Sequence, residues 1–136
     1  MLRRLNDARV ARLATAGADG RPHIVPIAFA HDHVNLYFAV DDKPKRTRDL
    51  KRLRNIARNP RVSVLVDHYE DDWTRLWWIR VDGVAHVIAH EADAQHAVDL
   101  LVARYTQYER TRPLGPVVAI SIERMTGWAA ADNPGC

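Results

Sequence analysis

The sequence predicts a mainly β protein of the α+β class, a small antiparallel barrel of about six strands with two to three helices. Three observations support this fold class. Short apolar runs rich in branched and aromatic residues recur along the chain, mostly in sequential order. Asp19-Gly20 is a strong signal for a tight β-hairpin. Two longer segments, 44–58 and 92–105, have the apolar spacing of helices.

The N-terminal third is expected to contain a short helix and three strands. Pro26 lies within the second strand. Because proline cannot donate a ladder hydrogen bond, this strand is expected at an edge, at a bulge or facing a ligand. His31-Asp32-His33 forms the turn before the third strand. The expected elements are the helix 2–8 and the strands 10–15, 23–30 and 36–40.

The rest of the chain alternates longer strands with two helices. Asn59-Pro60 ends the first helix because proline cannot continue it. Asp82-Gly83 predicts a bulge or bend within a long strand. The second helix has an apolar face that includes Ala97, Val98 and Leu101. The expected elements are the helices 44–58 and 92–105 and the strands 61–68, 76–90 and 117–128.

Length and composition favour a single domain, residues 1–136, of an ordinary globular protein. Hydrophobic residues make up 47% of the chain and charged residues 27%. The N-terminus lacks the apolar core of a secretion signal, and no run approaches the roughly 18 apolar residues of a spanning helix. Cys136 is the single cysteine, which excludes an internal disulfide. We therefore expect a cytoplasmic protein.

Positive charge is concentrated between Lys43 and Arg61. Nine basic residues share these nineteen positions with one acid, so the segment carries +8 while the whole chain carries +3. One interpretation is a solvated helix face. However, like charges four residues apart, such as Arg48 and Arg52, destabilise a helix by roughly 0.2–0.5 kcal/mol per pair. An external anion such as a phosphate would relieve this repulsion, so we expect an anion-binding site.

Metal and nucleophile chemistry have little support in the sequence. Among seven histidines, His86 and His90 on one strand would lie roughly 13 Å apart, too far to share an ion. Ser63 and Ser121 lie inside expected strands, without the elbow of a serine nucleophile. We therefore expect no metal and name no catalytic residue.

Trp77 and Trp78 are adjacent on an expected strand, so their side chains point to opposite faces. One ring is expected in the core. The other is expected at a subunit interface or against a flat ligand, where large aromatic rings outside a barrel are commonly found.

Several motifs, in order along the chain, resemble the pyridoxamine 5′-phosphate oxidase-like superfamily of flavin-binding split β-barrels. They are VARLA at 10–14, GRPHIVP at 20–26, the strand 36–40, the basic helix, NPRVS at 59–63 and WIRVDG at 78–83. The run DDWTRLWW at 71–78 resembles more narrowly an actinobacterial branch, the type B flavin/deazaflavin oxidoreductases, which use coenzyme F420. The resemblance implies the FMN-binding split-barrel fold.

The resemblance also implies a homodimer with two cofactor sites at the subunit interface. Carried over by position, the backbone groups of Phe38, Ala39 and Val40 would line the cofactor ring. Lys51 and Arg52 would bind the cofactor phosphate, with Asn55 as a nearby polar residue. The loop before Lys51 is longer than in most relatives, so Lys43, Lys45 or Arg46 could take the phosphate role instead.

The cofactor implied is coenzyme F420, with FMN as the alternative. Flavin-binding oxidases of this superfamily usually have a glutamine five residues before the glycine of the bend, where this chain has Trp78. Tryptophan can only stack or donate one N–H, which does not reproduce an amide's bonds to a flavin pyrimidine. The implied reaction is hydride transfer from reduced F420 to a planar conjugated acceptor, such as a quinone, an enone or a tetrapyrrole. Water, His68 and Tyr69 remain open as proton donors.

A non-enzymatic nucleic-acid binder acting through residues 43–61 is a second alternative. Single-strand binders combine basic and aromatic residues, but this segment contains no aromatic residue. The segment therefore fits a cofactor phosphate better than a nucleic acid.

Overall fold

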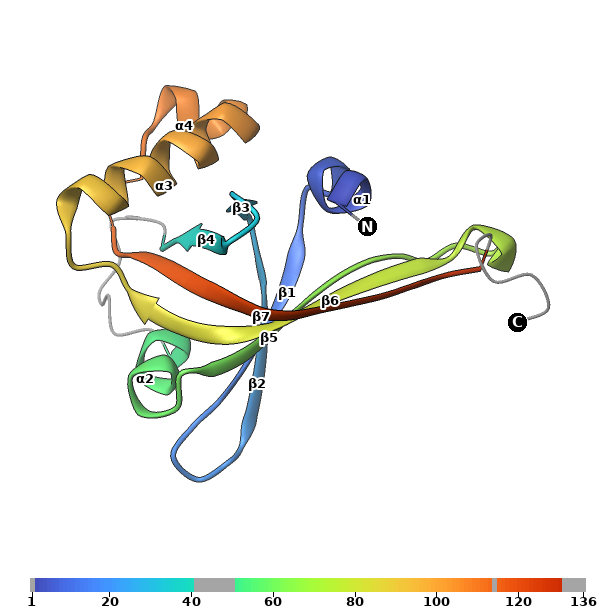
Figure 1. Ribbon diagram of the computed structural model, residues 1–136, viewed down its shortest axis with the longest axis horizontal. Coiled ribbons are helices and arrows are strands. Elements are labelled where there is room, and N and C mark those ends of the chain that lie inside the picture. Colours follow the sequence, from blue (N-terminus) through green and yellow to red (C-terminus); the bar gives the residue numbers. More distant parts are fainter. Residues whose placement is uncertain (1, 41–50, 114, 131–136) are drawn as a thin grey trace.

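The computed structural model describes residues 2–40, 51–113 and 115–130. Seven antiparallel strands form one sheet that curls into half a barrel, in the order β2-β1-β5-β6-β7-β4-β3 (Figure 1). The predicted split-barrel fold class is confirmed. The strands are β1 (Ala11–Ala16), β2 (Pro22–Ile27), β3 (Ala30–His31), β4 (Asn35–Ala39), β5 (Arg61–His68), β6 (Trp77–Val87) and β7 (Val117–Ala129), and the helices are α1 (Leu2–Asp7), α2 (Lys51–Arg58), α3 (Glu91–Arg104) and α4 (Thr106–Arg110), with a 3₁₀ turn, η1 (Trp73–Arg75).

The N-terminal hairpin agrees with its sequence signals. β1 and β2 pair over six residues across the Asp19-Gly20 turn, and Gly20 has a positive φ of 79°. Pro26 lies on β2, which is an edge strand as expected. The strand expected over 23–30 is interrupted after Ile27, because the Phe29 N–H donates to the Tyr105 hydroxyl at 3.0 Å.

Two other expectations need correction. The strand expected over 76–90 ends at Val87, and His90 instead precedes the first residue of α3. His86 and His90 therefore do not share a strand, because the chain turns to begin the helix. β3, η1 and α4 were not predicted. The basic helix is described only from Lys51 onward, and residues 44–50 of the prediction lie outside the described residues.

The bulge predicted at Asp82-Gly83 is confirmed by a register shift between β6 and β7. A Cβ atom added at Gly83 would lie 2.2 Å from the carbonyl oxygen of Ser121 on β7. Only glycine therefore permits the two strands to approach this closely.

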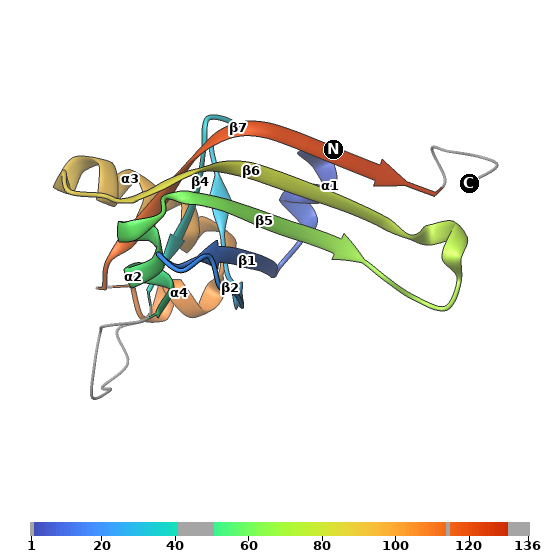
Figure 2. The same cartoon turned by 90° about the horizontal axis from the view of Figure 1, so that it is seen from below.

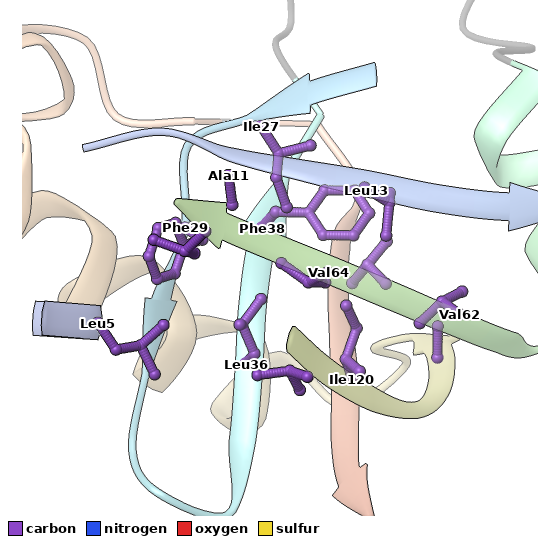
Figure 3. Close-up of a cluster of buried hydrophobic side chains, with 14 of the residues drawn as sticks. Leu5, Ala11, Leu13, Ile27, Phe29, Leu36, Phe38, Val62, Val64 and Ile120 are labelled. Atoms are coloured by element: carbon purple, nitrogen blue, oxygen red, sulfur yellow. The ribbon is translucent and has the colours of Figure 1, made fainter. Parts of the chain in front are cut away.

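Alternating side chains of the curled sheet fill the barrel interior. On β5, valines point inward and are buried, whereas Ser63 and Leu65 between them point outward and are partly exposed. Figure 3 shows side chains from α1, β1, β4, β5 and β7 meeting in one cluster. Trp77 packs against this cluster, and Trp78 points to the opposite face, as predicted. Burial of this apolar surface is the main stabilising contribution to the fold.

α3 covers the other face of β4 and β7, where the predicted apolar face of this helix is buried. The second core cluster consists of Tyr37, Ala97, Val98, Val117 and Ala119. At the end of α3, the Arg104 guanidinium donates to the carbonyl oxygens of Asn6 (2.7 Å) and Ala8 and lies over the Phe29 ring, 4.8 Å from its centroid. The helix end thus fixes the N-terminal segment to the barrel.

None of the helices that the structure describes lies in front of the outer face of β5, β6 and β7 (Figure 2). α2 lies at one end of this face and η1 at the other, in both views. Within 2–40, 51–113 and 115–130, we find no helix with the length and apolar character needed to cross a membrane.

Candidate functional site

A buried polar contact fixes α2 to the barrel. Asn55 is 5% exposed, and its Nδ2 donates to the Oγ1 of the buried Thr15 on β1 at 3.0 Å. A Cβ at Gly17 would lie 3.1 Å from the Asn55 Oδ1, so the chain passes tightly beside this amide. Because an unpaired buried amide is costly, this contact orients the helix on the barrel. The structure thus places the Asn55 side chain against β1.

Three of the four cations of α2 face away from the barrel. Lys51, Arg54 and Arg58 are exposed, whereas Arg52 lies one helical turn before the buried Ile56, is partly buried and has a buried Nε atom. No acidic residue lies within the helix. The outward face therefore presents three positive charges to an anion, with Arg52 partly buried beside them. Lys43, Lys45 and Arg46, the alternative phosphate residues, lie outside the described residues.

A cavity of about 400 Å³ opens on the outer face next to Thr15, the residue that holds α2. Its floor is a row of residues paired across neighbouring strands, Ala14 with Ser63 and Ser63 with Asp82. Small side chains leave this part of the face hollow. The cavity is thus close to the anchor of the basic helix and open to the uncovered face.

Asp82 is the charged group in this row. Ser63 Oγ donates to one Asp82 oxygen at 2.6 Å, and Arg80 Nε lies 3.2 Å from the other. The hydrogen bond from Ser63 lowers the pKa of the Asp82 carboxyl, and the Arg80 contact adds to this against the opposing effect of burial. Asp82 is therefore an ionised hydrogen-bond acceptor at neutral pH, held in one orientation.

The ring residues predicted at the end of β4 lie at the same end of the molecule as α2 in Figures 1 and 2. The Phe38 and Val40 side chains are buried in the core, and Ala39 is partly exposed. The Val40 N–H donates to the Pro116 carbonyl at 2.8 Å. A ligand at this strand would therefore contact backbone edges and Ala39, since the two large side chains point inward.

Trp78 lies far from both of these elements within one chain. It pairs with Asp67 near the end of β5 and with Trp128 on β7. Val84, six residues further along β6, pairs with Arg61 just after α2. Six strand residues span roughly 20 Å. The structure thus brings the residues at 38–40 and 51–55 to one end of the sheet, but places Trp78 toward the other end.

The two side chains considered as proton donors also lie at the end of β5 remote from α2. His68 stacks on Trp77, with ring centroids 6.4 Å apart, and its Nε2 pairs with Glu70. Tyr69 is 72% exposed. Neither side chain is close to α2 of its own chain.

Sequence reasoning missed a polar network around Asp32. One carboxylate oxygen accepts from the N–H groups of Val34 and Asn35, and the other accepts from the Tyr37 hydroxyl (2.8 Å) and contacts His96 Nε2 (3.1 Å). Burial alone would raise the pKa of Asp32, but these hydrogen bonds outweigh it and lower the pKa to about 2. In the part of the chain that the structure describes, no group of three or more His, Cys, Asp or Glu side chains is arranged to hold a metal.

Comparison with known proteins places this geometry in context. The family model described as "Pyridoxamine 5'-phosphate oxidase" matches residues 1–129. No curated protein sequence matches the chain.

Solved structures share the fold. A conserved hypothetical protein, Rv2991, from Mycobacterium tuberculosis is 22% identical with a TM-score of 0.76, over 93% of this chain and 80% of that one. A FAD-binding protein from Mesorhizobium loti is 26% identical with a TM-score of 0.68, over 93% and 87%. The FAD binding protein from Mycobacterium smegmatis is 22% identical with a TM-score of 0.63, over 91% and 87%.

Proposed function

Because the chain belongs to the pyridoxamine 5′-phosphate oxidase family, we propose that it is a cytoplasmic, homodimeric oxidoreductase dependent on coenzyme F420. The substrate is a planar conjugated acceptor, such as a quinone, an enone or a tetrapyrrole, that takes up hydride. The bound deazaflavin supplies hydride chemistry, because it has carbon at position 5. The protein binds, orients and electrostatically tunes this ring.

The observation that supports the proposal best is the basic face of α2 beside an open cavity. The helix is fixed by the buried Asn55–Thr15 contact, and it carries Lys51 and Arg52 without a single acid. A phosphate bound here would receive charge-assisted hydrogen bonds from side chains that already lie on a rigid element. These residues therefore fit the anionic tail of F420 or the phosphate of FMN.

The placement of Trp78 supports a site shared between two subunits. Trp78 lies roughly 20 Å along β6 from Val84, which pairs with Arg61 just after α2. A single chain thus offers the phosphate-binding residues at one end of the sheet and this aromatic ring toward the other. In a dimer, Trp78 of one subunit can lie close to the phosphate-binding residues of the other subunit and contact the cofactor ring there.

F420 is proposed before FMN because of the side chain at position 78. Tryptophan offers ring stacking and one N–H, and it has no acceptor oxygen for a flavin pyrimidine. Two of the similar structures are named FAD-binding proteins, so FMN or another flavin remains the alternative cofactor. Ser63, Asp82 and the bulge at Gly83 line the cavity next to Thr15, the residue that holds α2, and no metal is proposed there.

The experiment that tests the proposal compares cofactors directly. The purified protein is incubated with F420, FMN or FAD and passed through a gel-filtration column, and the absorbance of the protein peak is recorded. We expect F420 to co-elute and its affinity to fall with salt, since an anionic tail meets a basic surface. Co-elution of FMN alone would establish the flavoprotein alternative. A single-stranded oligonucleotide that binds as tightly as either cofactor would reject both.

A further inference from the structure

A second cavity, of about 320 Å³, lies where β6 ends and α3 begins, beside β4 (Figure 1). It shares no lining residue with the cavity next to Thr15. We propose that this second cavity binds a small organic ammonium ion, a primary amine attached to a short hydrocarbon body. The proposal is independent of the cofactor and of the dimer proposed above.

The polar lining of this cavity is rich in hydrogen-bond acceptors. Asp93 contributes a carboxylate, and none of the lysines and arginines that the structure describes lines the cavity. The other polar side chains are Asn35, Tyr37, His86, His90 and His96. A histidine is ordinarily neutral above about pH 7, and it then offers one ring nitrogen as an acceptor. At neutral pH the lining therefore carries negative charge, which favours a positively charged ligand.

The network around Asp32 determines which atoms are acceptors. His96 Nε2 lies 3.1 Å from the Asp32 carboxylate, which accepts hydrogen bonds but donates none, so the proton of the neutral His96 ring is on Nε2 and Nδ1 is an acceptor. The Tyr37 hydroxyl donates to Asp32 and therefore accepts from Asn35 Nδ2 at 3.3 Å. This orientation leaves Asn35 Oδ1 as a second acceptor. Two acceptors are thus set in advance for a ligand with N–H donors.

The cavity also has an apolar side for the hydrocarbon part of such a ligand. Val87, Ile88 and Ala119 line it beside the polar groups. The Tyr37 and His96 rings lie next to each other, edge to face, with centroids 5.9 Å apart. The face of a tyrosine ring attracts a cation within about 6 Å. A primary amine therefore fits both sides, because its three N–H donors suit the acceptors and its body suits the apolar wall.

The start of α3 does not reverse this preference. A helix N-terminus carries a partial positive charge, which favours anions. Glu91 and Asp93 in the first turn of α3 already offset that charge. A carboxylate or phosphate in the cavity would lie close to the Asp93 carboxylate and be repelled, so an anion is the less favoured occupant.

NMR titration at pH 7.5 tests the proposal with three probes of equal length, hexylamine, hexanol and hexanoate. We expect hexylamine to shift the imidazole signals of His86, His90 and His96, with an affinity at least tenfold higher than that of hexanol. Hexanoate should cause no saturable shift. Binding of hexanoate as tight as that of hexylamine would overturn the proposal, and so would the absence of any hexylamine-induced shift at these histidines.

Two matched variants locate the charge that holds the amine. Asp93→Asn should weaken hexylamine binding about three- to tenfold, because it removes the carboxylate of the lining. Glu91→Gln removes an equal charge from the same helical turn but outside the lining, and it should change the affinity less than twofold. Equal losses in the two variants would show that only the general charge of α3 attracts the amine, and would refute a site in this cavity.

Binding should also weaken as the pH falls from 7.5 to 5.5. Hexylamine keeps its charge over this range, because alkylammonium groups such as that of lysine lose a proton only near pH 10. Histidines ordinarily gain protons over the same range, so acceptors of the lining become positive charges that repel the amine. The charged groups near these histidines are Asp93 in the lining, Asp32 and Asp99 beside His96, and Arg112, which is paired with Asp99. An affinity that is unchanged at pH 5.5 would contradict the proposed site.

Discussion

Replacing Asp32 by asparagine should destabilise the protein in a pH-dependent way. The Asp32 carboxylate accepts two backbone N–H bonds, lies against the Tyr37 hydroxyl and His96, and has a side chain that is 27% exposed. Its pKa falls from the model-compound value of 3.8 to about 2. Since one pKa unit corresponds to about 1.4 kcal/mol, the ionised form contributes about 2 kcal/mol to folding.

The direction of the pH dependence follows from the lowered pKa. Because the folded pKa lies below the unfolded one, the stabilisation is fully present above about pH 4 and is lost as the pH falls toward 2. Asp32→Asn should therefore lower the free energy of unfolding by about 2 kcal/mol at pH 7, or the melting temperature by about 7 °C for a chain of this length. The difference from the unmodified protein should shrink between pH 4 and pH 2.

Urea denaturation from pH 2.5 to pH 7 measures this difference, at one protein concentration because dimerisation also affects stability. Asp93→Asn is the matched control. Asp93 is exposed on the same helix as His96, so its loss should cost less than about 1 kcal/mol. A destabilisation of Asp32→Asn that stays constant from pH 7 to pH 2.5 would show that the charge of Asp32 is not responsible.

Three further predictions concern the phosphate site, the bulge and the α3–α4 junction. Lys51→Ala or Arg52→Ala should weaken F420 binding about ten- to a hundredfold at all salt concentrations, whereas the effect of Arg58→Ala should fade in high salt. If Arg58→Ala weakens binding in high salt as much as Arg52→Ala does, the assignment of Lys51 and Arg52 to the phosphate is refuted. Gly83→Ala should cost at least about 2 kcal/mol in urea unfolding, because its Cβ meets a backbone oxygen; a neutral result would mean that β7 moves easily. Tyr105→Phe leaves the partly buried Phe29 N–H without its acceptor and should cost about 1–3 kcal/mol by the same assay, while an unchanged midpoint would indicate that water replaces the hydroxyl.

Local sequence signals predicted most of the fold. Pro26, the Asp-Gly turn and the Asp82-Gly83 bulge each act through the backbone of one or two residues, so their effect can be read without knowing what lies nearby. The apolar face of α3 was equally readable from its spacing. By contrast, the break after Ile27 depends on Tyr105, which is distant in sequence, and no local pattern indicates it.

The candidate site was less accessible to sequence reasoning. The basic residues of α2 were visible as a charge cluster, but the burial of Asn55 against Thr15 depends on how the helix meets β1. Asp32 and His96 are 64 positions apart and meet only because α3 packs on β4. Trp78 lies roughly 20 Å along β6 from Val84, the residue that pairs with Arg61, and this separation likewise follows only from the strand register.

The position of β7 in the sheet has a consequence for the synthesis of this protein. Among the strands that the structure describes, β7 comes last along the sequence, and it lies between β6 and β4, where it joins the β2-β1-β5-β6 part of the sheet to the β4-β3 part. Until residues 117–129 have left the ribosome, the nascent chain holds two incomplete sheets, each with an unpaired edge that faces the other. Such edges bind other strands readily, and their closure must wait for contacts that are distant in sequence. The growing polypeptide is therefore exposed to aggregation, and dependent on chaperones, until residues 117–129 have been synthesised.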